Sequence, residues 1–444
     1  MQPRTLTRMT RAWLRWASAL IPALASGLTT TYLLVSSNWR QWGVADMERL
    51  TPATTSFADL ANITLTADCI NQGLPLEGCD PYGRPFQPYV VLPARVLAWL
   101  GIGLDQTGIP GTLLALLTVV VVIGLALLIA SKWQRGPVGL ITVQVALAIS
   151  AISPGVILGM ERGQIEQLSL ALVTGALLLL GSDKPIKWLG AIASFLATAI
   201  KYLTVGMFLA FANKDALRRR PWAVIAAAAA SGLFLLASLP QIQLATETSG
   251  SAVPQTTMSA FGLTTTIATP FSGSPLFYFP PENISEMWPT LRIIGLIAFT
   301  TATGIAYLIA RRLPLPETNS HAWVLTVGSG AVLLFPYLIG TSHDYRLVFL
   351  IPLLAGAALW WGSSPNNPVL PVFLIIASTV ALLTSASMVP TPQEWRWPTW
   401  FVIVGDIGLF FVLAFIAALA IAGLGGRPRP QMASKGPPAK VRVG

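Results

Sequence analysis

The sequence predicts an all-α polytopic membrane protein, built as a bundle of about 11–12 transmembrane helices with folded outer loops. Apolar residues make up 54% of the 444-residue chain and charged residues only 10%, whereas roughly a quarter of residues are charged in soluble domains. Apolar runs of about 17 to 25 residues recur along the chain, and each is long enough to cross a hydrocarbon core of about 30 Å as a helix. A membrane β-barrel would instead show alternating segments of about ten residues.

The predicted spans follow one another from the first apolar run to about residue 424, so residues 1–424 are predicted to form a single membrane domain. The first run is too long for a signal peptide and lacks a convincing small-residue cleavage site, so we expect a retained span. The two runs that flank Lys201 are too short to span, and we expect two short helices that dip into the bundle and return. The spans are placed at about residues 13–35, 111–131, 138–158, 164–181, 187–200, 202–213, 221–240, 289–310, 322–340, 346–361, 368–387 and 400–424.

The Lys and Arg residues predict the orientation of the bundle. They gather in the N-terminal tail, between alternate spans and in the final segment, whereas most acids fall on the other side. This bias places both termini in the cytoplasm, and it holds only if the pair at Lys201 returns. Residues 425–444, rich in Gly, Pro, Lys and Arg, are expected to be a disordered basic tail that contacts anionic membrane lipids. The formal charge of +10 does not indicate a nucleic-acid partner, because the basic residues form no water-exposed patch.

Two long outer loops, at about residues 37–110 and 241–288, are expected to fold over the outer face, because structureless loops of this length are uncommon unless they are functional. The first loop holds the two cysteines of the chain, Cys69 and Cys79. An outer compartment permits a disulfide, and we predict a bridge between them, with two free thiols as the alternative. A zinc site is not expected, since Cys and His partners are too few.

Five polar clusters fall on the predicted outer side, and ionisable residues at membrane depth usually mark function. Each also has a structural explanation. Ser56 and Asp59 in SFADLANI fit a capping box, although Asp59, Asn62 and Thr66 would share one helix face. The other clusters have these alternatives: a rigid turn, an interfacial ion pair, a snorkelling lysine and an interfacial anchor. In chain order they are Asp80 and Arg84 in GCDPYGRPFQPY, Glu161 and Arg162 in MERGQIEQ, Lys201, and His343, Asp344, Tyr345 and Arg346 in SHDYRLVF.

These motifs also carry a family resemblance. FADLANI, CDPYGRPF, ERGQIEQLSLAL, AIKYLTVGMFLAF and HDYRLVFLIPLL, in this order, resemble the GT-C superfamily of polytopic glycosyltransferases over about residues 55 to 362. The chain is most similar to glycosyltransferase family 87, the polyprenyl-phosphate-mannose-dependent mannosyltransferases of bacteria. The resemblance implies a GT-C-like bundle in the bacterial plasma membrane with its active site on the outer face. One departure is QPYVVLP, where similar members have an aromatic-Pro pair, which leaves the acceptor side open.

The resemblance implies an inverting transfer of a sugar, mannose or another pentose or hexose, from a polyprenyl-phosphate donor to a cell-envelope glycolipid or glycan. Asp59 matches the catalytic base of the family, with Asp68 and Asp80 as alternatives. A base is needed because an acceptor hydroxyl is a poor nucleophile until a carboxylate takes its proton. Fixed cations stabilise the leaving phosphate, and no cofactor or metal is expected. The donor phosphate is assigned to Arg346, His343, Lys201 and Arg162, and orientation of the substrates to Glu161, Arg84, Asp344, Tyr345 and Asn62.

Two other functions remain open. The first is a transporter or flippase of a polyprenyl-linked sugar lipid. Transporters tend to show repeats and polar groups near the membrane midplane, and only Asp406, an acid inside the last span, favours that function. A non-enzymatic scaffold would not require an acid and several cations on one side.

Overall fold

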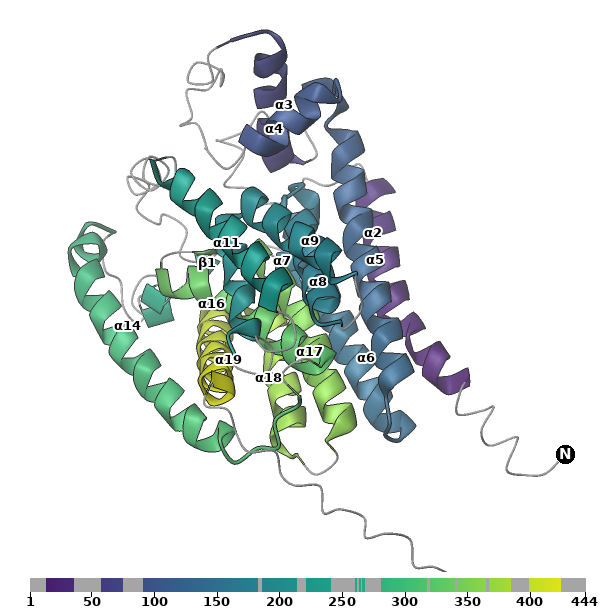
Figure 1. Cartoon of the computed structure of the whole chain (residues 1–444), viewed down its shortest axis with the longest axis vertical. Coiled ribbons are helices and arrows are strands. Elements are labelled where there is room, and N and C mark those ends of the chain that lie inside the picture. Colours follow the sequence, from purple (N-terminus) through teal and green to yellow (C-terminus); the bar gives the residue numbers. More distant parts are fainter. Residues whose placement is uncertain are drawn as a thin grey trace, which may run out of the picture.

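A computed structural model describes most of the chain, and nearly all of the described residues are helical (Figure 1). The described ranges are residues 13–35, 57–74, 91–182, 186–213, 221–240, 260–261, 263–264, 266–267, 281–317, 320–339, 342–364, 367–384 and 399–424. The predicted tail at 425–444 therefore lies outside them. Within the described residues the prediction of an all-α fold is confirmed, apart from one pair of two-residue strands.

The helices coincide with the predicted apolar runs. In the first half these are α2 (Leu20–Val35), α5 (Gly108–Lys132), α6 (Pro137–Ala151), α7 (Pro154–Glu161), α8 (Glu166–Leu180), α9 (Lys187–Ile200), the 3₁₀ helix η6 (Tyr202–Phe211) and α11 (Pro221–Ala237). In the second half they are α14 (Pro281–Ala310), α15 (His321–Trp323), the π-helix η8 (Val324–Gly328), α16 (Ser329–Ile339), the 3₁₀ helix η9 (Asp344–Phe349), α17 (Leu350–Ser363), α18 (Val369–Leu383) and α19 (Thr399–Leu424).

Not all of these helices are long enough to span a membrane alone. Within the described residues, six are long and apolar enough to cross, or seven if the bent pair α6 and α7 is one span. The shorter apolar helices α8, α9, η6, α11 and α18 have 10–17 residues each. The twelve apolar segments expected from the sequence are thus present as helices. About half of them are too short to cross a membrane alone, and these either combine with a neighbouring helix or lie within the bundle without spanning it.

Two predicted segments differ from straight spans. Residues 138–158 form two helices that meet at 44°, because Pro154 begins α7 and a proline disfavours helical backbone in the residue before it. At Lys201 the backbone is extended, so the predicted break is present, but it leads into a ten-residue 3₁₀ helix. Gly206 of η6 lies so close to α16 that a Cβ there would come within 2.6 Å of the Ala331 carbonyl oxygen.

The described parts of the two long loops contact the rest of the fold. In the first, α3 (Ala58–Asn71), α4 (Val91–Trp99) and the 3₁₀ turn η5 (Leu104–Gln106) pack together at the end of the bundle opposite the N-terminal end of α2 (Figure 1). Asp68 Oδ2 accepts the Leu104 N–H at 2.8 Å. In the second, strand β1 (Ala260–Phe261) pairs antiparallel with β2 (Ser342–His343). This pairing joins the loop to the chain segment that leads into η9.

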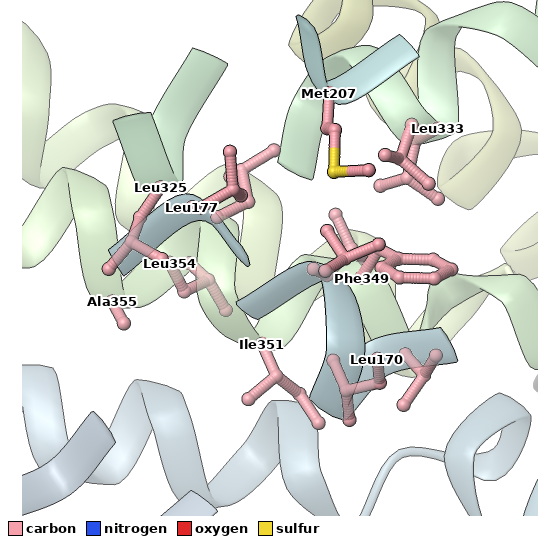
Figure 2. Close-up of a cluster of buried hydrophobic side chains, with 14 of the residues drawn as sticks. Leu170, Leu177, Met207, Leu325, Leu333, Phe349, Ile351, Leu354 and Ala355 are labelled. Atoms are coloured by element: carbon pink, nitrogen blue, oxygen red, sulfur yellow. The ribbon is translucent and has the colours of Figure 1, made fainter. Parts of the chain in front are cut away.

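The hydrophobic core extends through the whole bundle, and part of it lies where α8, η6, η9 and α17 meet. Figure 2 shows Leu170 of α8, Met207 of η6 and Phe349 of η9 in one apolar cluster with Ile351 and Leu354 of α17. All five side chains are 3% exposed or less. Interiors of this kind are close-packed and resist displacement, so the relative positions of α8, η6 and η9 are fixed by packing.

Candidate functional site

The site begins at the turn after α7, where the sequence is MERGQ. Gln164 N–H donates to the Gly159 carbonyl at 2.9 Å and Gly163 N–H to the Met160 carbonyl at 3.2 Å. These two bonds form a Schellman motif, which needs a left-handed residue after the helix. Gly163 supplies it with φ of +63°. The turn ends α7 at Glu161 and leaves the carbonyl groups of its last residues free to accept bonds from another element.

Those carbonyl groups accept the first N–H groups of α3. Phe57 N–H donates to the Glu161 carbonyl at 3.0 Å, and Asp59 N–H donates to the Arg162 carbonyl at 3.0 Å. The free donors at one helix start therefore satisfy the free acceptors at another helix end. The helix α3 follows Phe57, which provides no side-chain cap. Ser56, on which the capping-box interpretation depends, lies outside the described residues.

Phe57 has a backbone conformation that is rare for a bulky residue. Its φ is +66° and ψ is +48°, a left-handed geometry that costs about 1–3 kcal/mol for residues other than glycine. Its side chain is buried against two glycines: a Cβ on Gly111 would collide with the Phe57 ring, and a Cβ on Gly163 would come within 2.9 Å of the Phe57 Cβ. Packing thus holds the strained residue, which is two positions before Asp59.

Asp59 and Arg162 form a two-bond ion pair across this junction. Arg162 Nε donates to Asp59 Oδ2 at 2.6 Å, and Nη2 donates to Oδ1 at 2.5 Å. The side chains remain 24% and 22% exposed, respectively. A carboxylate has about four lone-pair positions, and the arginine uses two of them. Asp59 therefore has a fixed orientation and can still accept hydrogen bonds from a ligand.

A second ionic group lies at the start of α8. Glu166 is only 1% exposed, and its Oε1 is 2.8 Å from Lys201 Nζ and 3.7 Å from Arg346 Nε. Its position in the first turn is favourable because the helix dipole attracts an acid there. Glu166 thus connects three elements: α8, the break between α9 and η6, and η9.

The two ionic groups belong to one site. Asp59 and Arg346 both lie within electrostatic range of the Lys201 ammonium, and Arg162 and Glu166 are joined by a short turn. These five described residues comprise two acids and three cations, so their own charges sum to +1. A positively charged, largely buried position beside a partly exposed carboxylate can bind an anion and accept a proton in the same place.

The structure describes several predicted site residues. Asp59, Arg162, Lys201 and Arg346 lie together, although Arg162, which was assigned to the donor phosphate, binds Asp59. Glu161 lines a neighbouring groove. Asn62 is partly buried on α3, and its carbonyl accepts the Thr66 hydroxyl at 2.8 Å.

Other predicted residues are described only in part or not at all. For His343, Asp344 and Tyr345 only the backbone is described, in β2 and η9. Arg84, Asp80 and Cys79 lie outside the described residues. Cys69, on α3, is disulfide-bonded.

Two features differ from what the sequence suggested. Glu166 had no assigned role, although it is the most buried member of the site; its signal was an acid at the start of an apolar run. Asp68, an alternative base, accepts the Leu104 N–H and thereby anchors η5. In the described part of the chain, no group of three or more His, Cys, Asp or Glu side chains could hold a metal ion.

Comparison with models of known protein families, with characterised proteins and with solved structures found no match. The function is therefore argued from the site itself.

Proposed function

We propose that the chain is a multi-pass membrane glycosyltransferase, which moves a sugar from a polyprenyl-phosphate donor to an acceptor hydroxyl on the outer face of the bacterial plasma membrane, with inversion. The single observation that carries the proposal is the convergence of a partly exposed, oriented carboxylate with two cations that share one buried counterion. The apolar helices support the membrane location, and the motif order resembles GT-C enzymes.

In this proposal Asp59 is the general base. The acceptor O–H proton passes to a carboxylate oxygen of Asp59, while the acceptor oxygen forms a bond to the anomeric carbon. The bond between the anomeric carbon and the phosphate oxygen breaks, and the phosphate leaves with the electron pair. A single displacement of this kind inverts the anomeric centre. Arg162 holds the Asp59 carboxylate in a fixed orientation for the attack through its two hydrogen bonds.

Lys201 and Arg346 stabilise the leaving phosphate. Glu166 is the shared counterion that holds both cations in place. Both cations are mostly buried, and electrostatic interactions are stronger where water is excluded. Because the cations are held before the reaction, they need no reorganisation as negative charge develops on the leaving oxygen.

The test uses purified protein in lipid nanodiscs with a radiolabelled polyprenyl-phosphate mannose and a panel of lipid and glycan acceptors. Asp59→Asn is expected to slow transfer by roughly 10²- to 10⁴-fold, the usual contribution of a general base. Asp68→Asn is the matched control, an acid on the same helix whose Asn replacement can still accept the Leu104 N–H; it should transfer at the wild-type rate.

Two results would count against the proposal. Wild-type transfer by Asp59→Asn would remove Asp59 as the base. Absence of transfer with every donor and acceptor, together with movement of the labelled lipid across proteoliposomes, would favour transport over glycosyl transfer.

A further inference from the structure

A groove of about 480 Å³ lies beside the site, between α2, α7 and α18. Its volume is within the roughly 300–1,000 Å³ range of small-ligand sites. The walls are mainly apolar and include Leu28 and Leu33 of α2, Ile157 and Leu158 of α7, and Leu382 of α18. The bend between α6 and α7 forms part of the wall, since Ile152 and Pro154 line it. The groove therefore offers mainly apolar walls to a bound hydrocarbon chain.

One end of the groove is polar and lies next to Asp59. Thr30 of α2 donates to the Met160 sulfur at 3.5 Å, which places the end of α7 beside this level of α2. Phe57 N–H at the start of α3 donates to the Glu161 carbonyl, so Glu161 lies at the α3 end of the groove. Glu161 precedes Arg162, whose side chain binds Asp59. A headgroup at this end would be adjacent to the proposed base.

The charge of this end separates two classes of lipid. The described residues that line the groove include no Lys, Arg or His, and Glu161 is the only acid among them. The buried Oε2 of Glu161 has no hydrogen-bond partner within the described part of the chain. A hydroxyl group can form a hydrogen bond with this carboxyl group, whereas a phosphate would find no Lys, Arg or His side chain among the described residues of the groove wall. The cations assigned to phosphate, Lys201 and Arg346, lie on other elements.

We infer that this groove binds the hydrocarbon chain of the acceptor, and that the acceptor is a lipid with an uncharged, hydroxyl-bearing headgroup, which donates a hydrogen bond to Glu161. The inference rests on the proposed function and extends it by naming the acceptor class. The donor lipid is excluded from the groove by its phosphate and binds through Lys201 and Arg346.

The first experiment maps binding without requiring transfer. Two probes carry the same octadecyl chain with a diazirine: one has a neutral glycoside headgroup and the other a phosphate. After irradiation in nanodiscs, the neutral probe is expected to label peptides of α2, α7 and α18, and the phosphate probe is not. Glu161→Gln keeps an acceptor oxygen but removes the charge, so labelling of the groove by the phosphate probe should rise at least three-fold.

The second experiment fills the groove. Leu28→Trp places a larger side chain at a position that lines the groove and is 67% exposed. Leu24→Trp is the control, one helical turn earlier on α2, 57% exposed and outside the groove. Leu28→Trp should reduce labelling by the neutral probe and raise the KM for a lipid acceptor at least ten-fold, with KM for the donor unchanged. Leu24→Trp should change each value less than two-fold.

The outcomes separate this inference from the proposed function. Equal or stronger groove labelling by the phosphate probe in the wild-type protein would overturn the inference and assign the groove to an anionic lipid. Sugar transfer to soluble glycans that Leu28→Trp leaves unchanged would also overturn it, while the glycosyltransferase function stood. Specific labelling by the neutral probe without any transfer would support the lipid site and count against the proposed function.

Discussion

Replacing Glu166 by glutamine tests whether the buried acid holds the two cations of the site. The substitution keeps the size of the side chain and removes its charge, so Lys201 and Arg346 are left together without their shared counterion. Removing one partner of a buried ion pair costs about 3–5 kcal/mol, because an uncompensated charge stays buried. Lys201 and Arg346 are 12% and 21% exposed, compared with 1% for Glu166. Partial access to water places the expected loss at the lower end, about 3 kcal/mol.

A loss of about 3 kcal/mol changes the unfolding equilibrium by a factor of roughly 150. The measurement is equilibrium unfolding in mixed micelles with increasing sodium dodecyl sulfate, followed by tryptophan fluorescence. Glu286→Gln is the matched control, because Glu286 is an exposed acid on α14 and surface substitutions usually change stability by less than about 0.5 kcal/mol.

A double-mutant cycle identifies the cause of the loss. Lys201→Met should be strongly destabilising in the wild-type background and much less so in Glu166→Gln, since the ion pair is already broken there. We expect a coupling energy in the range of about 0.5–3 kcal/mol that contacting residues show. A coupling energy near zero, or a Glu166→Gln variant as stable as Glu286→Gln, would show that Glu166 does not hold the cations.

Further predictions concern the turn after α7 and the anion site. Gly163→Ala should destabilise the protein by about 1–3 kcal/mol, because Gly163 has φ of +63° and the new Cβ would come within 2.9 Å of the Cβ atoms of Leu60 and Phe57. Gly175→Ala is the control, because Gly175 lies in mid-helix and no atom is within 4 Å of the new Cβ; this variant should be neutral or more stable by up to about 1 kcal/mol. Equal changes in the thermal unfolding temperature of the two variants would refute the packing argument. Arg346→Gln should weaken binding of farnesyl phosphate about ten-fold and flatten its salt dependence, because fewer charges remain to be screened; titrations at two salt concentrations measure both, and an unchanged affinity would exclude Arg346 from the anion site.

Much of the fold could be predicted because apolar length is a property of the sequence alone. The runs and the break at Lys201 were found from hydropathy and charge. The bend before Pro154 is indicated locally by the proline itself, but residues 138–158 are long enough to be taken for one straight span. The 3₁₀ geometry of η6 depends instead on its close packing against α16 at Gly206, and no local pattern specifies that contact.

The site was predictable in its members but not in its pairings. Asp59, Arg162, Lys201 and Arg346 were identified because charged residues beside apolar runs are unusual. Which acid binds which cation depends on how α3, α7 and α8 meet, and Arg162 binds Asp59 instead of remaining available for a phosphate. No role was predicted for Glu166, because an acid in the first turn of a helix is explained by its favourable interaction with the helix dipole. Only its burial, which the sequence does not show, distinguishes Glu166 from such an acid.

The turn at residues 161–163 links the fold to the proposed chemistry. Its backbone carbonyl groups receive the start of α3, its arginine orients the proposed base, and its glutamate lines the groove. Donor and acceptor would therefore be recognised by different elements, the donor by cations on η9 and beside η6, and the acceptor by α2 and α7. Since Asp59 is fixed through backbone and side-chain bonds to the same turn, a shift of α7 would move the base and the acceptor together. The rate of transfer should then depend on the packing of this turn as strongly as on the charged groups themselves.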